Sequence, residues 1–124
     1  MKVTMNNSLI VLMLSLAFVT TTAHAAKAKQ KLQSPAPGVV CDKYVCADKS
    51  GISALLTEKY LDKKRSQQLM SQGDFDHSEF TFANGIFCDV KEKLCRKDRY
   101  YGVDGKRSGA VDPETTRLLF EPNK

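Results

Sequence analysis

Histidine is scarce in this sequence of 124 residues, which contains only His24 and His77. Nucleophilic catalysis needs a serine or cysteine close to a base, and His77 stands alone in a polar stretch that predicts a loop. The spacing of a phosphate-binding loop and the C-x-x-C pair of a thiol oxidoreductase are also missing. We therefore predict a protein that is not an enzyme and holds no cofactor. An enzyme of a type without a recognisable motif, centred on His77 or Asp98, remains the alternative.

Long apolar runs are missing after residue 25. Before it, residues 9–19 form one apolar run, which is shorter than the roughly 20 residues that span a bilayer. Lys2 precedes this run, and Ala23-His24-Ala25 places small residues at the two positions that signal peptidase reads. We predict a signal peptide over residues 1–25, cleaved after Ala25, and export to the periplasm. No stable membrane insertion is expected after cleavage, and an uncleaved anchor is the alternative.

The positive charge of this chain is concentrated near its N-terminus, and the rest of the sequence has little net charge. The whole chain carries a net charge of +5, to which Lys2 and the three lysines of residues 26–37 contribute. The remainder is close to neutral, which does not indicate a nucleic-acid surface. Residues 26–37 also contain two prolines and little to bury, so we predict a flexible basic leader. A tether to an anionic envelope surface is the alternative for this leader.

The chain has four cysteines, and all of them follow residue 25. An even number in a small exported chain predicts two disulfides. The spacings C-x4-C and C-x6-C are not those of common zinc sites, so we predict no metal. A two-residue turn at Lys43-Tyr44 would bring the first two cysteines opposite each other, and a tight turn at Lys91-Glu92 would do the same for the last two. Local bridges are favoured, but pairing across the two hairpins stays open: Cys41, Cys46, Cys88 and Cys95.

Helix and strand patterns complete the fold prediction. Residues 52–72 have a helical pattern that we expect to break near Asp62, giving two helices. Asn84-Gly85 predicts a type I′ hairpin turn. Asp112 followed by Pro113 predicts the start of a C-terminal helix. The predicted fold class is α+β, with a small antiparallel sheet made of two disulfide-linked hairpins and two or three short helices.

Two segments of the sequence resemble each other, residues 38–46 (GVVCDKYVC) and residues 85–95 (GIFCDVKEKLC). Each reads glycine, two apolar residues, Cys-Asp, a polar turn, an apolar residue and cysteine. This similarity suggests a duplicated hairpin-helix unit over residues 38–73 and 80–120, with coincidence as the alternative. We predict a single domain over residues 38–120 and a frayed tail over residues 121–124.

The segments GVVCDKYVCAD, LTEKYL and FTFANGIFCDVKEKLCRKDRYYGVDGKRSG resemble the YcgJ-type family, also called Fels prophage protein-like. Members are small exported proteins of enteric and related bacteria. The resemblance implies a periplasmic location and a cysteine framework in which Cys41, Cys46, Cys88 and Cys95 form disulfides. It implies no catalytic or ligand-binding residue. This chain has Asp62 where the family pattern has glycine.

The function predicted from the sequence is a small binding or interaction module of the cell envelope, whose partner is an unknown protein or envelope component. A rigid disulfide scaffold that carries a glycine-rich loop over residues 102–109 motivates this prediction. The alternatives are an inhibitor of a cell-wall hydrolase and a purely structural envelope factor. The predicted contact surface consists of Tyr100, Tyr101, Lys106 and Arg107.

Overall fold

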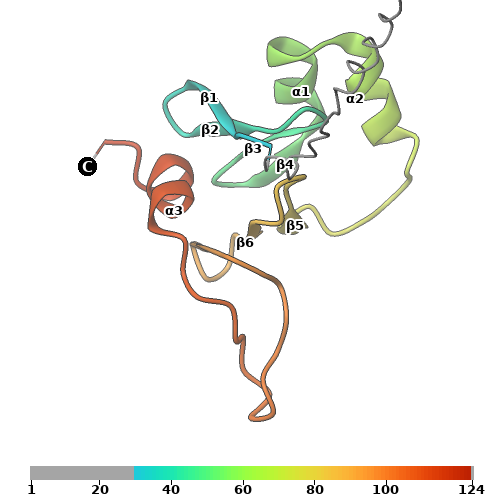
Figure 1. Cartoon of the computed structure of the whole chain (residues 1–124). Helices are drawn as coiled ribbons and strands as arrows, with labels where there is room; N and C mark the ends of the chain where they lie inside the picture. The colour runs from blue at the N-terminus through green and yellow to red at the C-terminus, as the bar shows by residue number, and fades with distance from the viewer. Residues whose placement is uncertain (1–29, 124) are drawn as a thin grey trace, which may run out of the picture.

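The computed structural model describes residues 30–123, so the predicted signal peptide, its cleavage site and the first part of the leader lie outside the described residues. Two antiparallel sheets and three helices make up the fold (Figure 1). The first sheet has the order β1 (Gln33–Ala36), β2 (Val39–Cys41), β3 (Cys46–Asp48) and β4 (Gly51–Ser53), and helices α1 (Ala54–Tyr60) and α2 (Lys63–Met70) follow it. The second sheet has the order β5 (Glu79–Thr81), β6 (Phe87–Asp89) and β7 (Leu94–Arg96), and α3 (Pro113–Phe120) ends the fold. This arrangement confirms the predicted α+β class.

The prediction of a flexible leader over residues 26–37 is wrong for its last residues, because Gln33–Ala36 form β1, an edge strand paired with β2. Pro37 and Gly38 connect the two strands, and Gly38 has a φ of 79°. A proline followed by a glycine with positive φ is the chemistry of a type II turn. Ser34 Oγ also donates a hydrogen bond to the Val39 carbonyl oxygen at 2.8 Å. The Pro-Gly pair was therefore the sequence signal for this strand.

The helical segment breaks at Asp62, as predicted. Asp62 is the N-cap of α2, and its side chain accepts a hydrogen bond from the Arg65 N–H at 2.7 Å. This N–H and the Arg65 guanidinium lower the pKa of the Asp62 carboxyl. The predicted start of the first helix is wrong, because Gly51–Ser53 form β4 and Ser53 caps α1.

Both disulfides are local, Cys41–Cys46 and Cys88–Cys95. The two cysteines of each bridge are direct partners across neighbouring antiparallel strands. Directly opposed strand residues lie close enough for a disulfide to join them. The structure therefore confirms the favoured pairing and rules out the bridges across the two hairpins.

The predicted type I′ turn at Asn84-Gly85 is wrong in its details. Phe82 N–H donates to the Ile86 carbonyl oxygen at 2.8 Å, which leaves a three-residue loop between the strands. Gly85 has a φ of 93°, whereas Asn84 does not have positive φ. A type I turn followed by a left-handed glycine is the usual geometry of a three-residue hairpin. The Asn84 side chain accepts the Ile86 N–H at 3.0 Å instead of entering the left-handed region.

The main core lies between the two sheets and α3. Leu119 on α3 is 1% exposed and belongs to the same cluster as Val40 and Ala47 of the first sheet. The cluster also contains Cys88 and Cys95 of the second sheet. A smaller cluster lies between the Cys41–Cys46 hairpin and α1. The helix of the C-terminal half therefore completes the core of the N-terminal half.

We call residues 38–73 unit one and residues 80–120 unit two, following the internal similarity. In unit one, the Cys46 N–H donates to Thr57 Oγ1 at 2.9 Å, and this hydroxyl donates to the carbonyl oxygen of the cap residue Ser53 at 2.7 Å. In unit two, the Cys95 N–H donates to Thr116 Oγ1 at 2.9 Å, and this hydroxyl donates to the Asp112 carbonyl oxygen at 2.8 Å. Each threonine joins its helix to its cysteine hairpin in the same way.

The aspartates that follow the first cysteine of each unit also match. Asp42 Oδ1 accepts hydrogen bonds from the N–H groups of Tyr44 and Val45, at 2.7 and 2.8 Å. Asp89 Oδ1 accepts from Lys91 at 2.8 Å and from Glu92 at 3.3 Å. Both aspartates are 6% exposed, and each closes the turn of its own hairpin. The sequence similarity thus corresponds to equivalent contacts in the two units.

Candidate interaction site

The two units differ most at one connection. In unit one, Asp48 pairs with Gly51, so only Lys49 and Ser50 join β3 to β4. In unit two, the Lys97 N–H donates to the Ala110 carbonyl oxygen at 2.7 Å, and the residues between them form a long excursion. We call residues 97–110 the arm. Figure 1 shows the arm as the orange loop that extends away from both sheets.

The arm is a narrow ribbon whose two sides are hydrogen-bonded to each other. The Ser108 N–H donates to the Tyr100 carbonyl oxygen at 2.9 Å, and the Gly102 N–H donates to the Lys106 carbonyl oxygen at 2.8 Å. Gly109 permits the closest approach, since a Cβ there would lie 2.5 Å from the Asp98 carbonyl oxygen. These contacts give the arm a defined backbone instead of a free loop.

The base of the arm is joined to the start of α3 by an ion pair. Lys97 Nζ lies 2.8 Å from Asp112 Oδ1, and Asp112 is also the N-cap of α3. Partial burial raises the pKa of Asp112, but the hydrogen bonds from Lys97 and Thr115 outweigh it, so this pKa lies below its ordinary value. The helix cap and the arm therefore share one ionised carboxylate.

Arg107 fastens the arm to the outer face of the second sheet. Its guanidinium lies between two aromatic rings, 4.3 Å from the ring centroid of Phe87 and 4.3 Å from that of Tyr101. Arg107 Nη2 also lies 3.1 Å from Glu79 Oε1 and 3.9 Å from Asp89 Oδ2. A guanidinium stacks on aromatic faces and pairs with carboxylates in the same plane. We call Phe87, Arg107 and Tyr101 the stack.

The four residues predicted to form a contact surface have different environments. Tyr100 and Tyr101 are 63% and 61% exposed, and Lys106 is exposed near the tip of the arm. The Arg107 side chain is only 10% exposed, so its role is to hold the arm rather than to present a free charge. Val103 at the tip is fully exposed and was missed, although its place inside the glycine-rich loop was a signal.

A polar depression of about 500 Å³ lies beside the stack. Three acidic and three basic residues line it, together with Tyr101 and Gly105. Three ion pairs join these residues, Arg107 with Glu79, Arg107 with Asp89, and Arg96 with Glu92. The acidic residues are Glu79, Asp89 and Glu92, and the basic residues are Arg96, Lys106 and Arg107.

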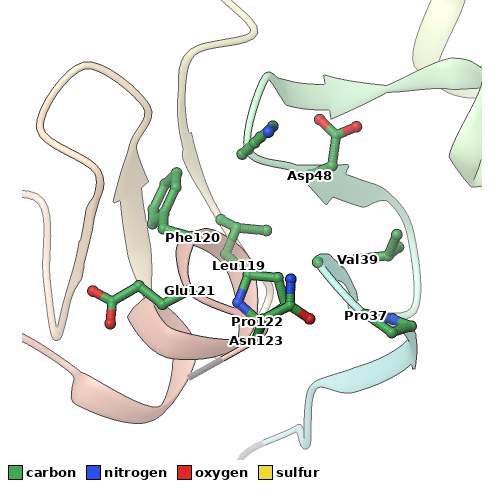
Figure 2. Close-up of a pocket in the computed structure, with 10 residues that line it drawn as sticks. Pro37, Val39, Asp48, Leu119, Phe120, Glu121, Pro122 and Asn123 are labelled. Atoms are coloured by element: carbon green, nitrogen blue, oxygen red, sulfur yellow. The ribbon is translucent and has the colours of Figure 1, made fainter.

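A second depression, of about 580 Å³, lies where the two units meet (Figure 2). Pro37 and Val39 line one side of it, next to Asp48, and Leu119 to Asn123 line the other side. Of the tail predicted from residue 121, Glu121 forms the C-cap of α3 and Pro122 lies in this wall. This depression is mostly apolar and lies apart from the arm.

The residues considered for catalysis lie outside both depressions. His77 Nδ1 lies 3.1 Å from the Ile52 carbonyl oxygen, and its ring stacks on Phe75 at a centroid distance of 4.3 Å. Asp98 Oδ1 accepts the Tyr100 N–H at 3.0 Å, within the arm. Over residues 30–123, no group of three or more histidine, cysteine or acidic side chains is placed to hold a metal ion. No helix in this range is long and apolar enough to cross a membrane.

These features define a class of protein: a small α+β domain with two disulfide-bonded hairpins and one protruding arm. The chain belongs to the YcgJ family, since the family model described as "YcgJ protein" matches residues 32–120. It is 64% identical over 89 residues to a protein of Escherichia coli (strain K12) described as "Uncharacterized protein YcgJ". The alignment covers 72% of this chain and 73% of the relative. No solved structure matches the chain.

Proposed function

We propose that this chain is a non-enzymatic binding module of the bacterial periplasm, and that the arm contacts its partner. The observation that carries the proposal is the contrast between the two-residue turn of unit one and the arm at the same place in unit two. A connection that is much longer than its fold requires is commonly a functional element. The two disulfides support an oxidising compartment, because such bonds persist outside the cytosol.

The side chains of the arm suit a protein partner. Tyrosine supplies a large contact area at low cost in conformational entropy, and both tyrosines of the arm are largely exposed. Val103 adds an apolar side chain at the tip. The backbone of the ribbon is already ordered by its internal hydrogen bonds. A preorganised element loses less entropy on binding, which favours affinity.

A cell-wall hydrolase is the second, more specific candidate for the partner. Glycoside hydrolases carry two carboxylates across a cleft, and a narrow arm has the shape to enter one. The arm contains four basic residues against two acidic ones. Within the described chain, the side chains of Arg99 and Lys106 make no ion pair, so they are available to a carboxylate.

Site-specific photo-crosslinking in the periplasm tests the binding proposal. A photoreactive amino acid replaces Val103 at the tip of the arm, and a matched control carries it at Leu55, which is 82% exposed on α1. We expect a discrete adduct from position 103 and none from position 55. Adducts at position 55 alone, or no adduct from either position in cells that export the protein, contradict the proposal.

Inhibition assays with chicken-type, goose-type and phage-type lysozymes test the more specific candidate. Inhibition that is lost in the double variant Arg99→Glu, Lys106→Glu supports it, because charge reversal opposes contact with a carboxylate. The absence of inhibition for every lysozyme type refutes the hydrolase version and leaves the crosslinking result to decide the broader proposal.

A further inference from the structure

The outer face of the second sheet is covered by side chains of the arm. In unit one, Val40 and its cross-strand partner Ala47 lie under α3 in the main core. The equivalent pair in unit two is Phe87 and Arg96. The guanidinium of Arg107 lies on the Phe87 ring, and the ring of Tyr101 lies against the same guanidinium. Arg96, which stands where unit one has the buried Ala47, lines the polar depression.

The stack ends in an open aromatic face. Phe87 is 4% exposed and Arg107 lies on it, whereas Tyr101 is 61% exposed. The Tyr101 ring thus contacts the guanidinium and still exposes most of its surface to solvent. A flat ligand surface with C–H groups packs well on such a face, because the face of an aromatic ring carries partial negative charge.

The charged side chains of the depression are of both signs, and most of them are joined in ion pairs. Glu79, Asp89 and Glu92 are balanced by Arg96, Lys106 and Arg107, so the lining has no net charge. The lining therefore presents hydrogen-bond acceptors and donors side by side, with neither sign of charge in excess. A neutral ligand rich in hydroxyl groups can bond to both kinds of group, since carboxylates accept and guanidinium groups donate hydrogen bonds.

We propose that the Tyr101 face and the polar depression form a saccharide-binding site, whose ligand is a short chain of uncharged pyranose rings. A pyranose offers one apolar C–H face to an aromatic ring and hydroxyl groups that both donate and accept. A depression of about 500 Å³ lies in the size range of small-molecule sites. Tyr101 packs against the sugar face, and the Arg96–Glu92 pair at the wall bonds vicinal hydroxyls. The site goes beyond the proposed function, because it needs no protein partner.

Titrations followed by amide chemical shifts test this site, with the ¹⁵N-labelled protein purified with both disulfides formed. The probes are tetra-N-acetylchitotetraose, maltotetraose and inorganic phosphate. We expect saturable shifts around Tyr101, Gly105 and Lys106 with at least one saccharide, at a dissociation constant of about 1 mM or below. No saturable shift with either saccharide, or tighter binding of phosphate, overturns the proposal. The two saccharides distinguish an amino-sugar glycan from a neutral hexose glycan.

Variants of the tyrosines locate the binding face. Tyr101→Leu keeps an apolar cover on Arg107 but removes the flat ring, and we expect it to weaken saccharide binding roughly tenfold. Tyr101→Phe keeps the ring and should retain binding. The matched control is Tyr100→Leu, since Tyr100 is equally exposed on the arm but does not line the depression. Unchanged binding in Tyr101→Leu, with the arm amides at their wild-type positions, overturns the proposal.

Discussion

Unit one and unit two make the same internal contacts and end with different surfaces. In both, a buried aspartate closes the cysteine hairpin through its Oδ1, and a buried threonine joins the hairpin to a helix. Unit one connects its last two strands through Lys49 and Ser50. Unit two places the arm at that position. The difference shows which part of unit two serves the hairpin-helix scaffold and which part is added to it.

Asp42 and Asp89, which close the two cysteine hairpins, differ in what their second carboxylate oxygen contacts. Asp42 Oδ2 accepts the Ala83 N–H at 2.7 Å and so joins unit one to unit two. Asp89 Oδ2 lies 3.9 Å from the Arg107 guanidinium and so faces the arm. The Oδ2 of Asp42 therefore connects unit one to unit two, whereas the Oδ2 of Asp89 helps to orient the arm.

The largest expected difference between the units concerns their disulfides. Replacing Cys88 and Cys95 by alanine should lower the free energy of unfolding more than replacing Cys41 and Cys46. Both bridges close short loops, for which the loss is roughly 2 kcal/mol. Only Cys88–Cys95 lies in the main core, where the shorter side chains also leave a cavity. Urea unfolding of the two double variants measures the difference. A larger loss of unfolding free energy in the Cys41–Cys46 variant would contradict this prediction.

The two threonines should behave alike. Thr57→Val and Thr116→Val each leave the N–H of a buried cysteine without its acceptor, which costs about 1–3 kcal/mol. Both side chains are almost fully buried, so valine is tolerated sterically. The matched controls Thr57→Ser and Thr116→Ser keep the hydroxyl and should lose less. Thermal unfolding with calorimetric analysis compares the four variants, and a cost confined to one unit contradicts the equivalence.

The N-caps of α1 and α3 should differ in how their contribution to the free energy of unfolding depends on pH. Ser53→Ala and Asp112→Ala should each cost about 1 kcal/mol. Of these two cap residues only Asp112 titrates, and its pKa is lowered in the folded state. Its contribution is therefore present above the ordinary value near pH 3.9 and is lost as the pH falls through the lowered pKa.

Asp112→Asn keeps an acceptor at the cap but removes this titration. We expect its unfolding free energy to fall less steeply than that of the wild type as the pH is lowered below about 4. Ser53→Ala should leave the slope unchanged, because serine does not titrate. Urea midpoints measured across this pH range provide the test, and equal slopes for Asp112→Asn and the wild type refute the role given to Lys97 and Asp112.

The sequence predicted the local disulfides well because cysteine spacing and hairpin geometry are local properties. It also indicated the break at Asp62 and the helix start at Asp112-Pro113, since caps are local too. It missed β1 because the composition of the leader outweighed the Pro37-Gly38 turn. The role of Thr57 and Thr116 was not predictable, because each hydroxyl acts on a cysteine that is distant in sequence.

The contact surface itself stays a prediction, but the structure shows the environment of each of its residues. The tyrosines and the glycine-rich loop pointed to the arm, and both tyrosines are exposed. Arg107 was expected to be a free contact, but Phe87 and Tyr101 enclose it. That outcome depends on the packing of the Arg107 side chain against Phe87 of β6, which residue types and spacing alone do not specify.

The central claim is that the arm is added to a scaffold that is complete without it. The most direct test is the ¹H–¹⁵N spectrum of a variant in which residues 98–109 are replaced by Lys-Ser, the turn of unit one. We predict a folded spectrum in which the amides of Cys46, Thr57 and Thr116 keep their wild-type positions, with changes confined to the neighbourhood of Phe87 and Arg96. An unfolded spectrum, or displaced amides throughout unit one, would contradict the claim.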